Sequence, residues 1–322
     1  MSMLRSSGLA FRRVASAAEF GRVAVLLGGR SAEREISLLS GSAVHAALAR
    51  RGVDAHAVDP AETPLSSLPG AGFDRVFVAL HGPGGEDGTV QGALEWLGLP
   101  YTGSGVLGSA IGMDKLRTKQ LAIANGVATP PFRVLADAAD CRTAAAELGL
   151  PLAVKPATQG SSVGMSRVER AEDMVGAWRV AAALDPVVIA EPWIQGQELT
   201  VGVLQGEALP DIRIETPRSF YDYQAKYFAD DTRYHIPCGL TADAEAALKE
   251  AALAAFRAAG AQGWGRADFM LGGDGVPMLL EINTVPGMTD HSLVPMAARA
   301  VGIDFDELCW RVLETSFARE RA

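Results

Sequence analysis

The stretch MLLEINTVPGMTDHS, residues 278–292, begins like a buried strand and ends in a loop broken at Pro286 and Gly287. Within the strand, a carboxylate and an amide stand at alternate positions, Glu281 and Asn283. Side chains of a strand alternate between its two faces, so both oxygen-bearing groups project to the same side. Two oxygen-bearing side chains on one face of a core strand need a binding partner. The segment before the strand helps to identify it.

The preceding segment, GRADFML followed by GGDG, predicts a hairpin with this strand. A four-residue loop from Gly272 to Gly275 pairs Leu271 with Val276. The same register sets Asp268 opposite Leu279. The two strands would then be neighbours in an antiparallel sheet.

This register also sets Arg266 opposite Glu281, and it brings four polar side chains to one face: Arg266, Asp268, Glu281 and Asn283. The two carboxylates and the amide are hard oxygen donors, which suit Mg²⁺, an ion that often completes its shell with substrate phosphates. The alternative is a solvated face with an Arg–Glu cross-strand pair, which is common in sheets. The hairpin alone favours neither interpretation.

The composition narrows the class of protein. The chain has 322 residues, 48% of them hydrophobic and 21% charged, which is enough for two or three domains. Its net charge of -9 argues against a general nucleic-acid binder, and its apolar runs are too short to span a bilayer. Cys141, Cys238 and Cys309 are far apart and suggest neither a disulfide framework nor a zinc site, so a reducing cytoplasm fits best.

Residues 1–20 are basic and serine-rich, with no acid before Glu19. This composition faintly resembles an organellar transit peptide, and it also fits a disordered leader or an upstream start codon. We expect a disordered leader and exclude the segment from the fold.

The next hundred residues alternate short apolar strands with helices. The pattern predicts strands at 23–27, 53–58 and 76–80, and helices at 37–50, 89–97 and 106–124. Such alternation implies a parallel sheet whose ligands bind at the carboxyl ends of its strands. We assign residues 21–117 to this N-terminal α/β domain.

Two further units follow the boundary at Pro130-Pro131. The first, residues 118–197, reads as a small α+β module with strands at 132–135, 152–155 and 187–191 and helices at 138–148 and 173–183. The second, residues 198–318, reads as antiparallel hairpins. Its long polar and aromatic segment, residues 217–238, is predicted to be a flap over the site.

Three features of the middle unit fit a nucleotide site. Lys155 ends a strand and precedes PATQGSSVG, whose Ser161 and Ser162 offer backbone N–H groups to phosphates. EPWI, residues 191–194, reads as a hinge between domains, and Glu198 lies where it could hold a ribose. Taken singly, the loop could be an ordinary flexible turn and EPWI an ordinary strand end.

The ordered combination of motifs is more specific. MDK, VKP with the serine-glycine loop, EPWI, QELTV, GWGRADFM and LLEINTVPGMT together resemble the ATP-grasp superfamily, and more closely the D-alanine:D-alanine ligases. LLGGRSAEREISL, ALHGPGGEDGTVQG, YTGSGV, FYDYQAKY and HSLVPMAARA also resemble that family, so the resemblance covers residues 22–315. It implies an α/β fold of ATP-grasp architecture, in which an N-terminal parallel-sheet domain joins two α+β modules that clasp ATP.

The resemblance implies a cytoplasmic, homodimeric enzyme of peptidoglycan precursor synthesis. It would join two D-alanines through a D-alanyl phosphate, with ATP as substrate and two Mg²⁺ ions that Mn²⁺ could replace, and without nucleic-acid or membrane partners. One alternative is a depsipeptide ligase that uses D-lactate, although Lys226-Tyr227 goes with dipeptide synthesis in the family. A second alternative is an ATP-binding regulator that has lost catalysis, although no metal or oxyanion residue is missing.

The family's functional residues map onto this chain one by one. For the metal, the resemblance implies Asp268, Glu281 and Asn283, with Glu281 bridging the two ions. For ATP, it implies Lys115, Lys155, Ser161, Ser162, Glu191, Pro192, Trp193, Ile194, Glu198 and Lys226. For the substrates and catalysis, it implies Glu33 at the first ammonium with its partners Ser161 and Tyr227, His81 as lining, Arg266 and Gly287 as the oxyanion hole, and Ser292 with Leu293 at the second carboxylate.

Overall fold

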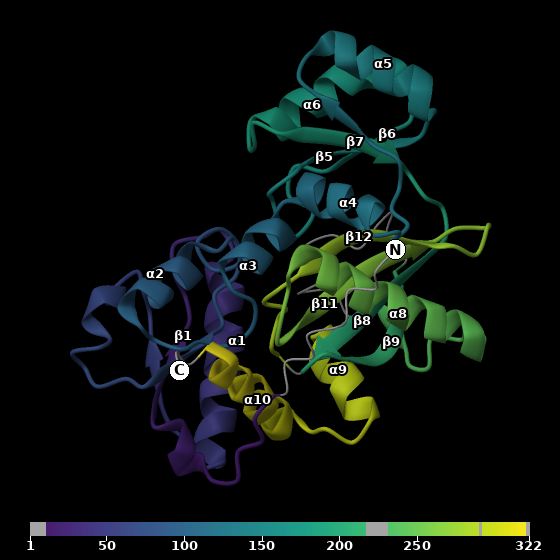
Figure 1. The fold of residues 1–322 in the computed structure, drawn as a ribbon. Helices are drawn as coiled ribbons and strands as arrows, with labels where there is room; N and C mark the ends of the chain where they lie inside the picture. Colours follow the sequence, from purple (N-terminus) through teal and green to yellow (C-terminus); the bar gives the residue numbers. More distant parts are fainter. Residues whose placement is uncertain (1–10, 217–230, 290–291, 320–322) are drawn as a thin grey trace.

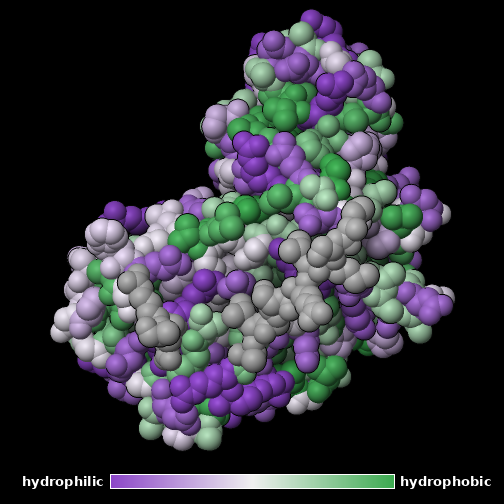
Figure 2. Space-filling model, viewed as in Figure 1, coloured by the Kyte–Doolittle hydropathy of each residue, from purple (hydrophilic) through white to green (hydrophobic). Residues whose placement is uncertain are grey.

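The computed structural model describes residues 11–216, 231–289 and 292–319, and in these ranges the chain forms three sheets with helices packed on them. Figure 1 shows the four-stranded sheet in an upper lobe, the five-stranded sheet below it, and the N-terminal sheet at lower left. The upper lobe stands clear of a wider body (Figure 2). No helix in the described part of the chain is long and apolar enough to cross a bilayer.

The first sheet is parallel, as predicted, and its strand order is β2-β1-β3. Its elements are β1 (Arg22–Leu26), β2 (Asp54–Val58), β3 (Arg75–Val78), α1 (Arg34–Arg50), α2 (Thr89–Leu97) and the short η2 (Leu65–Ser67). β1 is buried on both faces, which explains its continuous apolar run. The turns after β1 and β3 carry Glu33 and His81 to the carboxyl edge of the sheet, where ligands bind in such folds.

The expected leader, residues 1–20, is part of the fold from residue 11 onward, which corrects our exclusion of it. η1 (Ala17–Phe20) places Phe20 in the core, fully buried. Its ring lies 4.8 Å from that of Trp310 and 5.7 Å from that of Phe317, centroid to centroid. The local composition gave no sign of this, because the partners come from the far end of the chain.

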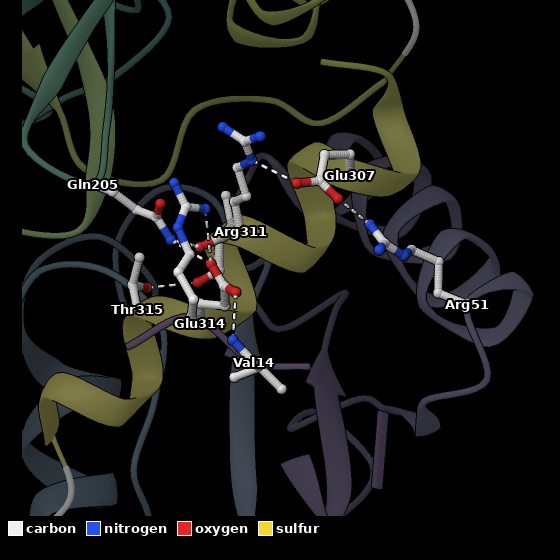
Figure 3. Close-up of polar contacts among 9 residues, drawn as sticks. Val14, Arg51, Gln205, Glu307, Arg311, Glu314 and Thr315 are labelled. Atoms are coloured by element: carbon white, nitrogen blue, oxygen red, sulfur yellow. Dashed lines mark hydrogen bonds and ion pairs between the residues drawn. The ribbon is translucent and has the colours of Figure 1, made fainter. Parts of the chain in front are cut away.

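A second contact ties this segment to the C-terminal helix. The Val14 backbone N–H donates to Glu314 Oε1 at 2.9 Å, and Gln205 Nε2 donates to Glu314 Oε2 at 2.8 Å (Figure 3). The exposed Arg13 lies 3.3 Å from the same carboxylate, whose side chain is 2% exposed. We call these four residues the Glu314 junction; it joins the N-terminal segment, the turn after β8 and helix α10.

The helix predicted over 106–124 is two helices, α3 (Val106–Met113) and α4 (Lys115–Ala124). Asp114 is extended and caps α4, since its side chain accepts a hydrogen bond from the Arg117 N–H. An N-cap inside an otherwise periodic stretch breaks the helix, and periodicity alone did not reveal it.

The second sheet has the order β4-β7-β5-β6 and is antiparallel throughout. Its elements are β4 (Arg133–Leu135), β5 (Leu152–Pro156), β6 (Ser166–Val168), β7 (Val188–Pro192), α5 (Ala138–Leu148), α6 (Met174–Ala182) and η3 (Ala171–Asp173). The prediction missed β6, which has three residues and too little periodicity to read. The loop between β5 and β6 faces the rest of the molecule and carries the serine-glycine motif.

The third sheet has the order β10-β9-β8-β11-β12. Its elements are β8 (Gln197–Leu204), β9 (Glu207–Glu215), β10 (Arg233–His235), β11 (Trp264–Leu271), β12 (Pro277–Asn283), α8 (Ala242–Ala259) and α9 (Leu293–Ala300), followed by α10 (Phe305–Glu314) and η4 (Thr315–Arg319). β10 pairs with β9, so the last part of the expected flap, 217–238, belongs to the sheet. Residues 217–230 of that flap lie outside the described residues.

The two faces of the third sheet have different neighbours. α8 packs with alternate residues of β8 and β11, including Leu199 and Phe269, in one buried cluster. On the other face, a Cβ added at Gly202 would lie 3.6 Å from Val294 of α9. Since Gly202 pairs with Arg266, the polar residues of the hairpin share the face covered by α9.

The register of the β11–β12 hairpin differs from the predicted one. Leu271 pairs with Pro277 rather than Val276, which moves the pairing by one residue. Without a further change, Glu281 would move to the opposite face from Asp268. A β-bulge prevents this, because Leu280 is an extra residue of β12 without a partner on β11.

The bulge restores the predicted face. Asp268 lies opposite Glu281, and Arg266 lies opposite Asn283. The prediction that these four side chains share one face is therefore confirmed, although the partners predicted for Arg266 and Asp268 were each wrong by two residues.

Candidate functional site

Two adjoining cavities lie between the sheets. The larger, of about 520 Å³, is bounded by the second sheet on one side and the third on the other. The smaller, of about 70 Å³, is formed where the N-terminal turns, the loop after β5 and the β11–β12 hairpin converge. Residues on the lining of both cavities are Lys115, Arg266, Glu281 and Leu293. The two cavities therefore meet at the hairpin.

The structure brings the predicted site residues together at these cavities. Those on the larger one are Lys115, Lys155, Ser162, Glu191, Pro192, Trp193, Ile194, Glu198, Arg266, Asp268 and Glu281. Those on the smaller one include Glu33, His81, Ser161, Asn283, Gly287, Ser292 and Leu293. Lys226 and Tyr227 lie outside the described residues.

On the hairpin face, the charges are arranged in pairs. Arg266 donates from Nε and a terminal nitrogen to the two Asp268 oxygens, at 2.8 and 2.7 Å, and Thr200 donates to Oδ1 at 2.6 Å. Lys115 Nζ lies 3.0 Å from Glu281 Oε2. Asp268, Glu281 and the Asn283 amide supply only oxygen atoms, so they could hold a hard divalent cation.

Behind the larger cavity lies a cluster of three buried charges. The Glu191 carboxylate is held between Lys155 Nζ and Lys119 Nζ, the latter at 2.7 Å, and Lys119 also donates to Thr129 at 2.8 Å. Burial favours the neutral carboxyl, but the two ammonium groups outweigh it and lower the pKa of Glu191 below its ordinary value. Burial lowers the pKa of the Lys119 ammonium to about 8.

This cluster shows which groups the Glu191 side chain contacts. The prediction placed Glu191 to Ile194 at the adenine through backbone groups, and the side chain itself is committed to the two lysines. Pro192 pairs with Leu152 at the end of β7, and the Trp193 N–H is used by the Pro151 carbonyl at 2.9 Å. The Pro192 carbonyl and the Ile194 backbone are therefore the groups that could meet a base.

The loop after β5 has an unusual backbone. Ser161 and Ser162 both have positive φ values, 52° and 59°, a region that non-glycine residues seldom occupy. Such strain is found mainly at functional sites. Asp185 holds the start of the loop, since its Oδ2 accepts hydrogen bonds from both the N–H and the hydroxyl of Thr158.

The same loop reaches the N-terminal unit. A Cβ added at Gly160 would lie 2.7 Å from Glu33 Oε1, so the loop passes close to the Glu33 carboxylate, and a larger residue here would displace that side chain. Glu33 stands at the N-cap of α1, next to the glycine turn after β1. The carboxylate predicted to receive an ammonium thus lies beside the loop predicted to receive phosphates.

A buried network connects the smaller cavity to α1. His81 Nε2 lies 3.0 Å from Ser40 Oγ, which also accepts a hydrogen bond from the Met288 N–H at 3.1 Å. The His81 side chain is 4% exposed, so it supports the turns around the cavity as much as it lines it. Ser40 was not predicted, and its position in the middle of a helix gave no signal.

The N-terminus of α9 points its backbone donors at the smaller cavity. Ser292 is the N-cap residue, but its Oγ accepts from the Thr289 N–H at 3.0 Å and does not cap the helix. The first N–H groups of a helix lack intrahelical partners and favour an anion. A carboxylate bound there would meet the Leu293 N–H and the Ser292 hydroxyl.

Lys119 and Asp185 are two further supporting residues that the sequence interpretation missed. Lys119 lies four residues after Lys115 on α4, so the helical period placed both on one face. That spacing was the available signal, but burial of a lysine depends on its tertiary partners. The sequence around Asp185 did not distinguish it from an acidic residue on the surface.

These features together define the class of protein. A parallel-sheet unit and two α+β units that close on a cavity, with lysines on one wall and oxygen donors on the other, form the ATP-grasp architecture expected from the motifs. Family models described as D-ala D-ala ligase N-terminus and C-terminus match residues 65–104 and 121–314. The chain belongs to the D-alanine–D-alanine ligase family.

Individual relatives agree with this assignment. The chain is 62% identical to the D-alanine–D-alanine ligase of Alkalilimnicola ehrlichii, over 94% of this chain and 97% of the relative. Its fold matches the D-alanine–D-alanine ligase of Bacillus anthracis with a TM-score of 0.82, at 35% identity over 93% and 98% of the two chains. The VanG D-Ala:D-Ser ligase of Enterococcus faecalis matches with a TM-score of 0.80, at 28% identity over 92% and 99%.

Proposed function

We propose that this protein is an ATP-dependent D-alanine–D-alanine ligase that makes the dipeptide for peptidoglycan synthesis. The observation that carries the proposal is the meeting of the two cavities at Arg266 and Glu281. One cavity suits a nucleotide and the other suits small zwitterions, so the γ-phosphate and a substrate carboxylate would meet at the hairpin. Family membership and the 62% identical relative support the same activity.

The first step brings two anions together. A D-alanine carboxylate oxygen attacks the γ-phosphorus, and the bond to ADP breaks, which leaves D-alanyl phosphate and ADP. Lys115 and Lys155 lie on the wall of the nucleotide cavity, where they would neutralise phosphate charge. Glu33 would hold the ammonium of the same D-alanine at the other end.

Mg²⁺ fits the donor set, because Asp268, Glu281 and Asn283 offer only oxygen atoms and share one face beside the nucleotide cavity. Bound there, the ion supplies positive charge that stabilises the transferring phosphoryl group. We propose two ions, with Glu281 shared between them and Mn²⁺ able to replace them.

The second step forms the peptide bond. The amine of the second D-alanine attacks the acyl carbon, the carbonyl oxygen gains charge, and phosphate then leaves. Arg266 and the Gly287 N–H would donate to that oxyanion, and the Ser292 hydroxyl with the Leu293 N–H would hold the second carboxylate. Ser161 would help to orient the first substrate; Lys226 and Tyr227 are proposed as flap contributions to the phosphate and to Ser161.

The test is a competition between acceptors. The protein is incubated with ATP, Mg²⁺ and D-alanine, with and without excess D-lactate, and phosphate release and product masses are measured. We expect D-alanyl-D-alanine to dominate in both mixtures. Predominant D-alanyl-D-lactate would favour the depsipeptide ligase, and absence of phosphate release would favour a regulator without catalysis.

We also propose a cytoplasmic homodimer. Apolar side chains lie exposed on adjacent helices, including Trp96 on α2 at 91% and Leu107 on α3 at 67%. A Cβ added at Gly92 would lie 3.7 Å from Val106, so α2 and α3 present a common surface, and Figure 2 shows the apolar row along α3. Light scattering of the wild type and of Trp96→Ser tests this surface.

The domain ranges 21–117, 118–197 and 198–318 also remain our proposal, with residues 11–20 as a segment that packs on the first and last of them. The three sheets support a division into three units. Limited proteolysis followed by mass spectrometry would test the ranges through the positions of the first cuts.

A further inference from the structure

Three potential metal ligands gather on the α8 side of the third sheet, apart from the two cavities. They are Asp211 on β9, Cys238 just after β10 and Glu245 on α8, and their ligand atoms all lie within 4.8 Å of one another. α8 packs across β9 in Figure 1, which brings the helix residue over the strand residue. Asp211 and Cys238 are buried, and Glu245 is partly exposed.

One carboxylate oxygen of this cluster, Asp211 Oδ2, is poorly satisfied by hydrogen bonds from the described residues. Asp211 is 2% exposed, and among the described residues no nitrogen or oxygen donates to its Oδ2; the only polar hydrogen that faces this carboxylate besides Lys249 is that of the Cys238 thiol, a weak donor. Its Oδ1 faces Lys249 Nζ at 3.3 Å. A buried carboxylate oxygen without a strong donor is costly, and a cation bound on that side would remove the cost.

The distance between the other two ligand atoms fits a metal ion with tetrahedral coordination. Cys238 Sγ lies 3.7 Å from Glu245 Oε1. A tetrahedral zinc centre with Zn–S and Zn–O bonds of roughly 2.3 and 2.1 Å has a sulfur–oxygen edge of about 3.6 Å. The Leu240 N–H donates to the same sulfur at 3.4 Å and fixes its direction, as supporting groups do around metal ligands.

We propose that Asp211, Cys238 and Glu245 form a binding site for a divalent transition metal of the zinc class, with water as the fourth ligand. A sulfur ligand favours Zn²⁺ or Co²⁺ over Mg²⁺, which distinguishes this site from the oxygen face of the hairpin. On binding, the metal–sulfur bond forms, the thiol S–H bond breaks and its proton is released to solvent. The proposal does not depend on the ligase activity.

Lys249 is the natural competitor for this site. Its ammonium also lies 3.8 Å from Glu245 Oε2, and one third of its side chain is exposed, at 33%. It neutralises the carboxylates when no ion is bound, and it has room to move toward solvent when one is. Removing it should therefore strengthen metal binding.

The test uses the full-length protein, stripped with a chelator and titrated with Co²⁺ alone. We expect one Co²⁺ per chain to give a sulfur-to-cobalt charge-transfer absorption, which Zn²⁺ then abolishes. Cys238→Ser should lose this absorption, whereas Cys141→Ser, which removes another buried cysteine, should keep it. Lys249→Met should bind Co²⁺ about tenfold more tightly.

Two results would overturn the proposal. One is a wild-type titration without a sulfur-to-cobalt band, which would leave only oxygen sites. The other is a band that persists in Cys238→Ser. If Cys238→Ser fails to fold, Asp211→Asn retains the thiol and should weaken Co²⁺ binding; unchanged affinity in that variant would also count against the site.

Discussion

Glu191 and Glu314 are both buried glutamates, but they have different partners. Glu191 lies between two ammonium groups, Lys119 and Lys155, at the wall of the nucleotide cavity. Glu314 accepts mainly from neutral donors, the Val14 N–H and the Gln205 amide. Two lysines and one carboxylate give a net charge of +1 beside the cavity. A positive charge at this position would attract phosphate groups. Among the described residues, the one cation at Glu314, the exposed Arg13 at 3.3 Å, only balances the carboxylate, so the Glu314 junction has no excess positive charge and is structural.

This contrast predicts which property each substitution changes. Residues of the cavity should affect turnover, residues of the Glu314 junction should affect unfolding, and Lys119, which stands behind the cavity, should affect both. The following experiments test whether effects on turnover and effects on unfolding separate in this way.

Glu281→Gln should have the largest effect. It removes the charge proposed to be shared between two Mg²⁺ ions, so turnover should fall by about 10²–10³-fold, while the melting temperature stays close to that of the wild type. Phosphate release at saturating Mg²⁺ is the measurement. Glu250→Gln, an exposed change on α8, is the control. Turnover near the wild-type value in Glu281→Gln would remove the metal assignment.

Lys119→Met should affect both properties. Removing one partner of a buried ion pair typically costs about 3–5 kcal/mol in the free energy of unfolding. Lys155 would also lose its fixed position, because Glu191 could then turn, and the KM for ATP should rise by roughly tenfold or more.

Urea unfolding and ATP kinetics measure the two effects of Lys119→Met. Arg117→Met, on the exposed side of the same helix, should change neither quantity. A variant that loses stability but keeps its KM for ATP would show that Lys119 supports the fold alone.

Glu314→Gln should affect stability only. The new amide would present N–H groups to the Gln205 amide, and the mismatch should cost about 1–3 kcal/mol of unfolding free energy. Glu307→Gln, a partly exposed change on the same helix, should cost less than about 1 kcal/mol. A raised KM for either substrate in Glu314→Gln would contradict the division.

The smallest effect concerns acid stability. The pKa of Glu191 is lowered in the folded protein, so its stabilising contribution is complete above the unfolded value of 4.5 and is lost as pH falls through the folded value. The double variant Lys119→Met/Glu191→Gln keeps the net charge of +1. Below pH 4.5 the unfolding free energy of both proteins should fall with pH. The slope should be smaller for the double variant than for the wild type, by up to roughly 1.4 kcal/mol per pH unit. Equal slopes would mean that Glu191 is not stabilised in its charged form.

The hairpin shows what the sequence could and could not predict. The shared face of Asp268 and Glu281 was predictable, because it depends only on whether the register is odd or even. The predicted and observed registers agree in that respect, because the one-residue shift at the turn and the bulge at Leu280 add up to two residues, which keeps Glu281 on the same face. The individual pairs were not predictable, because a bulge has no reliable signature in one sequence.

Other features depended on tertiary contacts from the start. Lys119 is not distinguished from a surface lysine by its local sequence, and only the packing of α4 against β12 and α8, together with the ion pair to Glu191 of β7, buries it. Phe20 follows a polar, basic stretch, and its aromatic partners stand nearly the whole chain away. Local pattern can place a helix or a strand, but it cannot name a partner at that distance.

The packing of Phe20 against Trp310 and Phe317 has a consequence for folding during protein synthesis. Phe20 is made 290 residues before Trp310 and 297 residues before Phe317, whose rings close the core around it. At about 5–20 residues per second, roughly 15–60 s separate the two events. During that interval Phe20 and the neighbouring apolar surface stay uncovered, so the nascent N-terminal sheet exposes a surface that a chaperone could cover.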